Sequence, residues 1–391
     1  MIGATQDPVS IRAVYLDVRP DDVAPKAPIC SRAVYGLVSG FPGFIARRLV
    51  ARLLADRPQL RLTAIVEARM LDAARSTAES LGADGARLDL VVGDIADRRL
   101  GLDDAQYSAL AGKVTEVHHL AAIYNLAVPL EIAQRVNVDG TGNVLDFCRA
   151  CPNFEQLHYV STAYVAGLRT GVVYEHELSL GQAHKNHYES TKFQAEVWVR
   201  EEMHRIPTTI YRPAIVVGDS RTGATQKFDG PYYLLRSIAR SVRRKEPLLQ
   251  LGRSGAPFNV VPIDFVVDAL AKVAQDREAI GETLHLVDPE PLTAGELNRL
   301  LAREYAGKEP KVRLPASLVT SSLRLKPVRE MFDDTPPESI RYLNHPVRFD
   351  TRRADAILAR NGLRCPKFPE YVGPIVDFFR EHEADPALKP V

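Results

Sequence analysis

Apolar positions follow two alternating spacings along the first half of the chain. Short runs rich in β-branched residues predict strands, and between them apolar residues recur every three to four positions, as on one face of a helix. The expected strands are Val34–Ser39, Arg61–Val66, Arg87–Val92, Glu116–Ala121, Gln156–Ser161 and Thr208–Tyr211. The expected helices are Phe44–Asp56, Met70–Leu81, Asn137–Cys151 and Tyr188–His204. This alternation predicts an α/β fold with a doubly wound parallel sheet.

The alternation breaks after Gly218, where the chain becomes rich in Gly, Arg and aromatic residues. We expect residues 31–218 to form the sheet domain, with short returns to it near 259–270 and 285–287. The remainder of 219–391, which carries Pro310, Pro315, Pro327, Pro336 and Pro337, should form a smaller, interleaved C-terminal domain over the ligand. Residues 1–30 lack the layout of a secretion signal and predict an irregular extension.

Composition narrows the class of protein. With 50 basic and 49 acidic residues, the chain has no excess of positive charge that would favour nucleic acid. No apolar run approaches the roughly 20 residues of a membrane-spanning helix. Four cysteines in 391 residues do not make a disulfide framework and fit the cytoplasm. Cys148 and Cys151 end an apolar helical run, which favours two buried thiols over a metal or redox site.

A glycine pattern lies between the first expected strand and helix. The stretch is Ser39, Gly40, Phe41, Pro42, Gly43, Phe44, Ile45 and Ala46. Gly40 would permit a tight turn, Gly43 a close approach of the backbone to a pyrophosphate, and Ala46 close helix packing. The free N–H groups of the helix would face the phosphates. This context predicts a Rossmann domain that binds NAD(H) or NADP(H).

Further cofactor contacts are expected where other strands end. Asp94 and Ile95 follow the third strand, and Asp94 could accept a hydrogen bond from adenine or simply stabilise a surface turn. Ala121 and Ala122 follow His118 and His119, which we interpret as packed strand-end residues. Near the nicotinamide we expect Tyr211, Pro213 and Val216.

The choice between the two coenzymes stays open. Glu67 ends the second expected strand, where an acidic residue binds the ribose hydroxyls and disfavours a 2′-phosphate. Arg69 and Arg75 lie just beyond it, and a guanidinium there could instead hold the phosphate of NADP.

Three residues indicate acid–base chemistry. Tyr188 and Lys192 are four positions apart on an expected helix and therefore share one face, where the ammonium should lower the pKa of the phenol. Thr162, at the end of the fifth strand, could donate a hydrogen bond to a developing oxyanion. Ser161 ranks second because neighbouring strand residues point oppositely. Asn137 either holds nearby backbone or caps a helix.

Together these motifs resemble the extended short-chain dehydrogenases, and among them the fatty acyl-CoA reductases and carrier-protein thioester reductases. On this resemblance Thr162, Tyr188 and Lys192 are the catalytic residues. Glu67 departs from that branch, which tends to have a polar or basic residue there. The stretches that carry the resemblance are Ser39–Ala46, His119–Tyr124, Tyr159–Gly167, Tyr211–Gly218, Gly230–Leu235, Asn259–Leu270 and Phe332–Asp350.

The resemblance implies reduction of a fatty acyl thioester, carried by CoA or an acyl-carrier protein, to an aldehyde and then an alcohol. Two alternatives are a reductase of a β-keto acyl or sterol-like compound and a non-catalytic dinucleotide sensor. A basic run at helical spacing would meet CoA phosphates or an acidic carrier, unless it is a solvated face: Arg236, Arg240, Arg243, Arg244 and Lys245. A homodimer and contact with a membrane surface are open alternatives.

Overall fold

The computed structural model describes residues 34–124, 128–250, 255–310, 312–313 and 342–389. The expected extension at residues 1–30, with Cys30, lies outside these ranges. So do four of the late prolines and the first part of Phe332–Asp350. Within the described ranges, no helix is long and apolar enough to cross a membrane.

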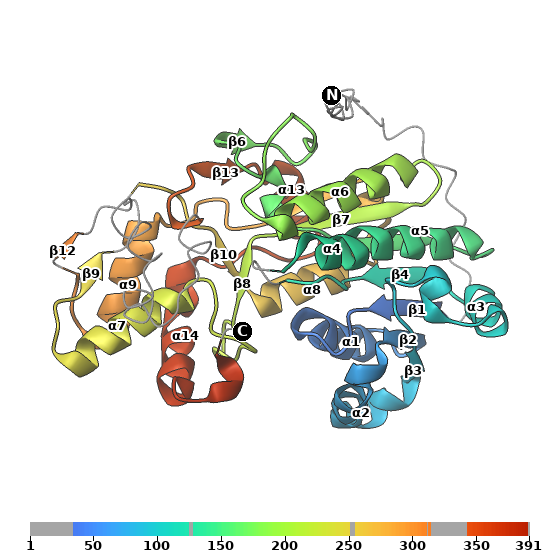
Figure 1. Ribbon diagram of the computed structural model, residues 1–391, viewed down its shortest axis with the longest axis horizontal. Helices are drawn as coiled ribbons and strands as arrows, with labels where there is room; N and C mark the ends of the chain where they lie inside the picture. The colour runs from blue at the N-terminus through green and yellow to red at the C-terminus, as the bar shows by residue number, and fades with distance from the viewer. Residues whose placement is uncertain (1–33, 125–127, 251–254, 311, 314–341, 390–391) are drawn as a thin grey trace, which may run out of the picture.

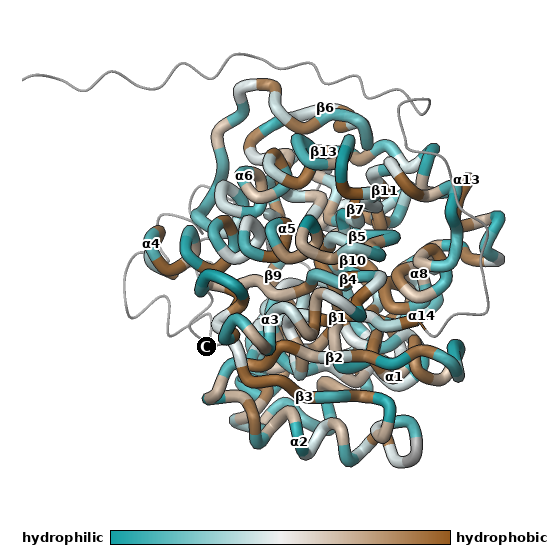
Figure 2. The backbone as a smooth tube through the Cα atoms, turned by 90° about the vertical axis from the view of Figure 1, so that its right-hand side faces the viewer, coloured by the Kyte–Doolittle hydropathy of each residue, from teal (hydrophilic) through white to brown (hydrophobic). Residues whose placement is uncertain are grey.

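A seven-stranded parallel sheet forms the centre of the protein. Its strand order is β11-β7-β5-β4-β1-β2-β3, so the chain runs outward from β1 in both directions. The strands are β1 Val34–Ser39, β2 Leu60–Val66, β3 Leu88–Val92, β4 Glu116–His119, β5 Gln156–Val160, β7 Thr208–Pro213 and β11 Thr283–Leu286. Figure 2 shows the stacked strands with helices on both sides. The predicted doubly wound sheet is confirmed.

Helices cover both faces of this sheet because each has one apolar stripe. The first helix, α1 (Phe44–Asp56), buries residues at helical spacing, namely Ala46, Leu49, Val50, Leu53 and Leu54. It packs beside α8 (Ile263–Val273) in the core on one face. The opposite face is covered by α3 (Asp104–Ala111), α5 (Gly140–Ala150) and α6 (His187–Glu202).

Most expected elements agree with the structure to within two residues, and the differences have physical reasons. Strand β4 ends at His119 because the amides of Leu120 and Ala121 donate to the Ser39 hydroxyl. The expected helix at Asn137–Cys151 begins earlier, with α4 (Leu130–Ala133) and a wide π turn at Gln134–Asp139 before α5. The second helix, α2, is Leu71–Ser80.

A second, smaller core packs beside the sheet domain. Its helices are α7 (Tyr232–Arg244), α9 (Ala294–Ala306) and α14 (Phe368–His382), which share one apolar cluster. Helix α13 (Arg352–Arg360) and three two-stranded pairings complete the fold: β8 (Ile215–Val217) with β10 (Val260–Pro262), β9 (Leu249–Gln250) with β12 (Val312–Arg313), and β6 (Gly171–Val173) with β13 (Val347–Phe349). Figure 1 shows α7, α9 and α14 together at one end of the molecule.

The two expected returns to the sheet differ in outcome. Residues 285–287 overlap β11, an edge strand of the main sheet. Residues 259–270 contain β10, which pairs with β8 outside that sheet, and then enter α8. This segment therefore returns as a helix on the face of the sheet. The segment carries apolar residues almost without interruption, so its pattern did not distinguish a buried strand from a buried helix.

The two neighbouring thiols are buried, as interpreted from the sequence. Cys148 lies in α5 and Cys151 follows its last turn. Burial raises the pKa of both thiols, that of Cys151 to about 12. Both side chains are therefore uncharged at neutral pH and pack as small apolar groups.

A buried ion pair joins α6 to the sheet. Glu196 and Arg212 of β7 have side chains no more than 1% exposed, and their closest contact is 2.6 Å. Ser161 donates to the same carboxylate at 2.6 Å, and Arg200 at 3.1 Å. Burial alone would raise the pKa of Glu196, but the guanidinium groups of Arg212 and Arg200 outweigh it and bring the pKa to about 2.

We predict that Glu196→Gln destabilises the fold at pH 7 by about 3–5 kcal/mol, because it leaves Arg212 as an uncompensated buried charge. The folded carboxyl has the lower pKa, so its stabilising contribution is present above the unfolded value of about 4.3 and is lost as the pH falls toward 2. Urea unfolding of both proteins should therefore show a difference that narrows on acidification. Equal free energies of unfolding at pH 7 would contradict this account.

Candidate active site

The loop between β1 and α1 is shaped by two glycines. Gly40 has a positive φ of 87°, and a Cβ added there would lie 2.8 Å from the amide nitrogen of Ala121. A Cβ on Gly43 would lie 2.7 Å from the carbonyl oxygen of Gly40. A larger residue at Gly40 would therefore push the loop away from the segment after β4, and one at Gly43 would clash within the loop itself.

This loop fits the pyrophosphate of a dinucleotide. Helix α1 begins after Gly43 without a side-chain cap, and its first helical hydrogen bond is donated by Arg47. The amides of Phe44, Ile45 and Ala46 are therefore free to bind an anion at the positive end of the helix dipole. Phe41 and Pro42 are buried, so only their backbone could face a cofactor.

The expected adenosine contacts lie at the carboxyl ends of β2 and β3. Glu67 accepts a hydrogen bond from Arg69 Nε at 2.6 Å, so the two rival coenzyme residues pair with each other. Asp94 accepts from the amide of Ala96 at 2.8 Å and thereby stabilises its own turn. Ile95 is 6% exposed and packs in the core.

Other expected contacts lie after β4, near the end of β7 and in β8. Ala121 and Ala122 are half-buried next to the glycine loop. The Tyr211 side chain is fully buried and its hydroxyl lies 3.2 Å from His158 Nδ1, so only its backbone is left to face a cofactor. Pro213 ends β7, where its carbonyl oxygen is 3.5 Å from the Thr162 hydroxyl. Val216 is half-buried in β8.

The structure brings Thr162, Tyr188 and Lys192 together. Tyr188 and Lys192 lie one turn apart on α6, and Thr162 follows β5 at the start of a short helical turn, Ala163–Ala166. The hydroxyls of Thr162 and Tyr188 hydrogen-bond to each other. Ser161 points the other way and donates to Glu196. Of the two neighbouring hydroxyls, Thr162 is therefore the one that faces the phenol.

Burial sets the protonation of the phenol. Burial raises the pKa of Tyr188 above its ordinary value near 10, and the hydrogen bond from Thr162 lowers it only in part. The phenol is thus a proton donor at neutral pH. The expectation that the neighbouring ammonium lowers this pKa is wrong: burial raises the pKa, and what opposes burial is the hydrogen bond to Thr162.

The ammonium of Lys192 is held inside the protein. It donates to the Tyr159 hydroxyl at 2.9 Å and to the carbonyl oxygen of Val160 at 2.8 Å. Burial lowers its pKa to about 7, against the opposing effect of the Glu196 carboxylate. Lys192 is therefore near its titration point at neutral pH.

Three residues near the site were not singled out for these roles from the sequence. Tyr159 and Glu196 contact or influence Lys192, and the Tyr124 ring packs edge-on against Tyr188 at 5.1 Å between centroids. The eight-residue spacing from Tyr188 to Glu196 was a signal for a shared helix face. Asn137 accepts from the amide of Ile123 at 2.8 Å and donates to Thr191, so it holds backbone rather than capping a helix.

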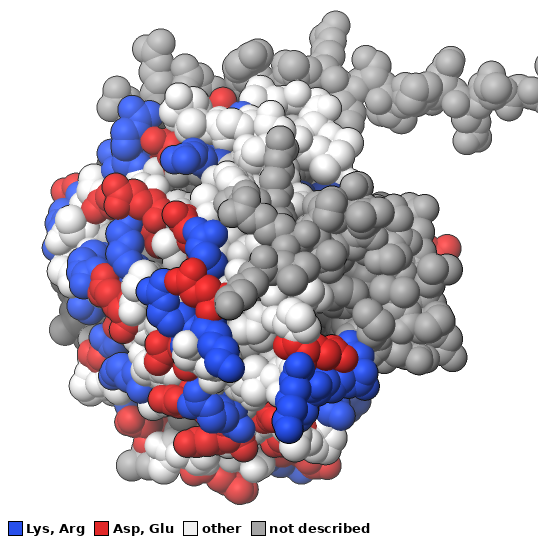
Figure 3. All heavy atoms as spheres, turned by 90° about the vertical axis from the view of Figure 1, so that its left-hand side faces the viewer, with Lys and Arg blue, Asp and Glu red and all other residues white. Residues whose placement is uncertain are grey.

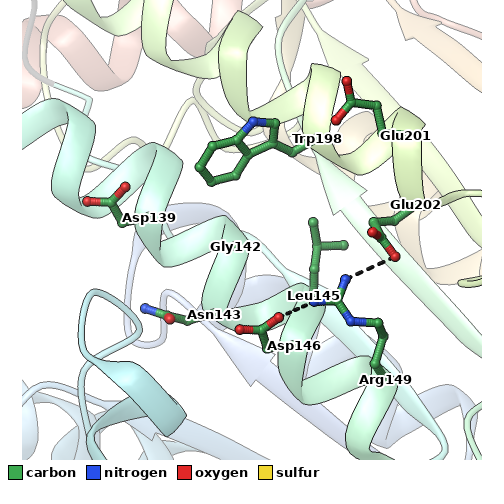
Figure 4. A pocket seen from close by; sticks show the side chains of 9 residues that line it. All are labelled: Asp139, Gly142, Asn143, Leu145, Asp146, Arg149, Trp198, Glu201 and Glu202. Carbon is green, nitrogen blue, oxygen red and sulfur yellow. Dashed lines mark hydrogen bonds and ion pairs between the residues drawn. The ribbon is translucent and has the colours of Figure 1, made fainter.

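A cleft of about 470 Å³ lies elsewhere, between α5 and α6. Figure 4 shows Trp198 across from Asp139 and Leu145, with Arg149 paired to Asp146 and Glu202. Trp198 lies on a different face of α6 from Lys192, and none of the expected site residues lines this cleft. The cleft is therefore separate from the candidate active site.

Comparison with known proteins identifies the family. The model of an NAD-binding family described as "Male sterility protein" matches residues 38–270. The chain belongs to this family. It is thus an NAD(P)-dependent reductase of the extended short-chain dehydrogenase type, as the motifs indicated.

Two curated relatives and one solved structure show which proteins this member of the male sterility family resembles. A linear gramicidin synthase of Brevibacillus parabrevis is 26% identical over 316 residues, which cover 75% of this chain and 6% of that protein. A putative fatty acyl-CoA reductase of Drosophila melanogaster is 25% identical over 276 residues, which cover 60% of this chain and 53% of that protein. The terminal R domain from the myxalamid PKS-NRPS biosynthetic pathway has a TM-score of 0.76 at 25% identity, covering 93% and 95%. The match thus spans a small part of the gramicidin synthase and about half of the fatty acyl-CoA reductase.

We predict that Thr162→Ala lowers kcat by about 10²–10³, because one hydrogen bond to the developing oxyanion is lost. Ser161→Ala is the matched control: it should lower the melting temperature through Glu196 and leave kcat nearly unchanged. Steady-state kinetics and thermal melting of both variants make the comparison. A larger loss of kcat in Ser161→Ala than in Thr162→Ala would mean that Ser161 donates to the oxyanion, and would contradict the assignment of Thr162.

Proposed function

We propose that this chain reduces an acyl thioester with NADPH or NADH and releases an aldehyde and a thiol. The observation that carries the proposal is the pair of hydroxyls, Thr162 and Tyr188, with the phenol held protonated on the helix that also carries Lys192. The likeness to a terminal R domain over 93% of the chain supports a thioester rather than a simple ketone.

A dinucleotide bound at the glycine loop would supply the hydride for the carbonyl carbon. Thr162 and Tyr188 donate hydrogen bonds to the carbonyl oxygen as it becomes negative, and Tyr188 gives up its proton. The resulting hemithioacetal then breaks its carbon–sulfur bond. In balance, one thioester, one reduced dinucleotide and one proton yield one aldehyde, one thiol and the oxidised dinucleotide. A second hydride transfer to the aldehyde would give the alcohol.

Helix α7 supports a thioester with a long, phosphate-bearing arm. Its first turn is joined to the end of β8, where the amide of Gly218 donates to the Tyr232 hydroxyl at 3.1 Å. Its 13 residues extend about 20 Å to a basic last turn. There Arg243 pairs with Glu383, while Arg244 and Lys245 are exposed and have no acidic partner among the described residues.

The basic end of α7 would meet the phosphates of CoA or the acidic face of a carrier protein. Figure 3 shows Lys and Arg side chains at this end of the molecule in separate groups beside acidic ones. The contribution is therefore a local contact rather than a broad positive field, and salt should screen it.

We predict that purified protein oxidises NADPH or NADH with acyl-CoA or an acylated carrier protein and releases one free thiol per dinucleotide consumed. A short thioester without phosphates should react with a higher KM. Added salt should raise KM for the phosphate-bearing substrates and leave it nearly unchanged for the short thioester, because only the former use the basic end of α7. Thiol release is followed with a chromogenic disulfide.

Turnover of β-keto esters or ketones without thiol release from any thioester would replace this proposal with the ketone alternative. Absence of turnover with every carbonyl compound, despite tight binding of the dinucleotide, would favour a sensor.

The Glu67–Arg69 pair leads to a prediction about the coenzyme. We propose that both coenzymes are accepted, since a 2′-hydroxyl can engage Glu67 and a 2′-phosphate can engage Arg69. Arg69→Ala should lower kcat/KM for NADPH about tenfold or more relative to NADH, and Glu67→Ala should shift the ratio the other way. Initial rates with both coenzymes test this. If the ratio of kcat/KM for NADPH to that for NADH is the same in both variants, the adenosine ribose does not bind beside Glu67 and Arg69.

A further inference from the structure

A row of side chains connects the catalytic ammonium with the glycine loop. Ser39, His119 and Tyr159 are lateral neighbours in the register of β1, β4 and β5, and therefore project from one face of the sheet. Figure 1 shows β4 between β1 and the sheet region beneath α6. Thr141 reaches this row from α5, and Lys192 from α6.

We propose that Tyr159, Thr141, His119 and Ser39 are positioning residues that hold the Lys192 ammonium and the glycine loop in one arrangement. This arrangement leaves a single N–H of Lys192 free for the dinucleotide. The inference concerns the reductase chemistry of the family and does not depend on which carbonyl substrate is reduced.

Three of the four contacts in the chain have hydrogen-bond distances of 3.0 Å or less. Lys192 Nζ donates to the Tyr159 hydroxyl at 2.9 Å, and Tyr159 hydrogen-bonds to Thr141. His119 Nε2 lies 3.0 Å from Thr141 Oγ1, and its Nδ1 lies 2.7 Å from Ser39 Oγ. None of the five side chains is more than 2% exposed. Buried polar groups are costly unless paired, so the chain is held as a unit.

The partners at each end determine the direction of every hydrogen bond. Thr141 donates to the carbonyl oxygen of Asn137 at 2.6 Å and so accepts from both Tyr159 and His119 Nε2–H. Ser39 accepts two amide hydrogens, from Leu120 and Ala121, and so donates its own to His119 Nδ1. His119 must then be neutral, consistent with burial and the charge of Lys192 lowering its pKa to about 3.

The chain determines what the ammonium can do. An ammonium has three N–H donors, and the protein engages two, at Tyr159 and Val160. The third is left for a ligand such as the ribose beside the nicotinamide. The other titratable groups near Lys192 are Tyr188 and Glu196 on its own helix and His119 on β4. Of these, the Glu196 carboxylate favours the charged form of Lys192. His119 is neutral and therefore adds no second positive charge beside the ammonium.

The test is Tyr159→Phe, which removes the hydroxyl and keeps the ring. Loss of a hydrogen bond to the charged form should lower the pKa of Lys192. The alkaline limb of the kcat profile reports loss of the Lys192 proton, since the Tyr188 phenol loses its proton only at higher pH. In Tyr159→Phe this limb should therefore move down by about one pH unit. The dissociation constant of the dinucleotide, measured by calorimetry without substrate, should rise about tenfold. An unchanged limb with an unchanged dissociation constant would overturn the proposal.

Thr141 offers a rescue experiment, because Thr141→Val removes the hydroxyl at constant shape and Thr141→Ser restores it. Valine should raise the dissociation constant as Tyr159→Phe does, and serine should return it close to the wild-type value. If the two variants bind the dinucleotide equally well and share one pH profile, the hydroxyl has no positioning role.

Tyr371→Phe controls for the loss of any buried hydroxyl. Tyr371 is 1% exposed in the smaller core, and its hydroxyl donates to the carbonyl oxygen of Val260 at 3.3 Å. Its loss should lower the melting temperature and change neither the pH limb nor the dissociation constant. Shifts in Tyr371→Phe as large as those in Tyr159→Phe would mean that loss of any buried hydroxyl has this effect, and would contradict a specific role for the proposed chain.

Discussion

The site depends on keeping the ammonium of Lys192 charged inside the protein. A buried charge is costly unless its surroundings compensate it. Helix α6 supplies the Glu196 carboxylate one turn farther on, and β5 supplies a hydroxyl and a carbonyl oxygen. Glu196 is in turn held ionised by Arg212 from β7. The electrostatics of one side chain therefore depends on a helix and two strands. The pKa of about 7, lowered from 10.5, shows that burial still outweighs this compensation.

The sheet topology explains why the chemistry lies where it does. Strand order reverses between β1 and β4, and ligands of open α/β sheets bind outside the carboxyl ends of strands at such a point. The glycine loop follows β1, the two small alanines follow β4, and Thr162 follows β5. Gly40 allows the first two segments to touch, since any side chain there would meet Ala121. The smaller helical core then adds α7, whose first turn hydrogen-bonds to the end of β8 and whose last turn is basic.

Local patterns were enough to predict much of this. Tyr188 and Lys192 could be paired from helical spacing alone, and Thr162 could be ranked above Ser161 from strand alternation. Long-range register could not be read in the same way. Tyr159, His119 and Ser39 become neighbours only through the pairing of β1, β4 and β5. Tyr211 was expected beside the nicotinamide, but its side chain belongs to the sheet core. The effect of burial on Tyr188 also depends on the folded surroundings rather than on one neighbouring lysine.

A crystal structure of the protein with a bound reduced dinucleotide and a non-hydrolysable acyl thioester analogue tests the central claim most directly. The account predicts the pyrophosphate at the amides that begin α1 and the nicotinamide ribose on the free N–H of Lys192. The analogue's carbonyl oxygen should lie within hydrogen-bond distance of both Thr162 and Tyr188. A nicotinamide ring directed away from these hydroxyls, or a ribose bound without contact to Lys192, would contradict it.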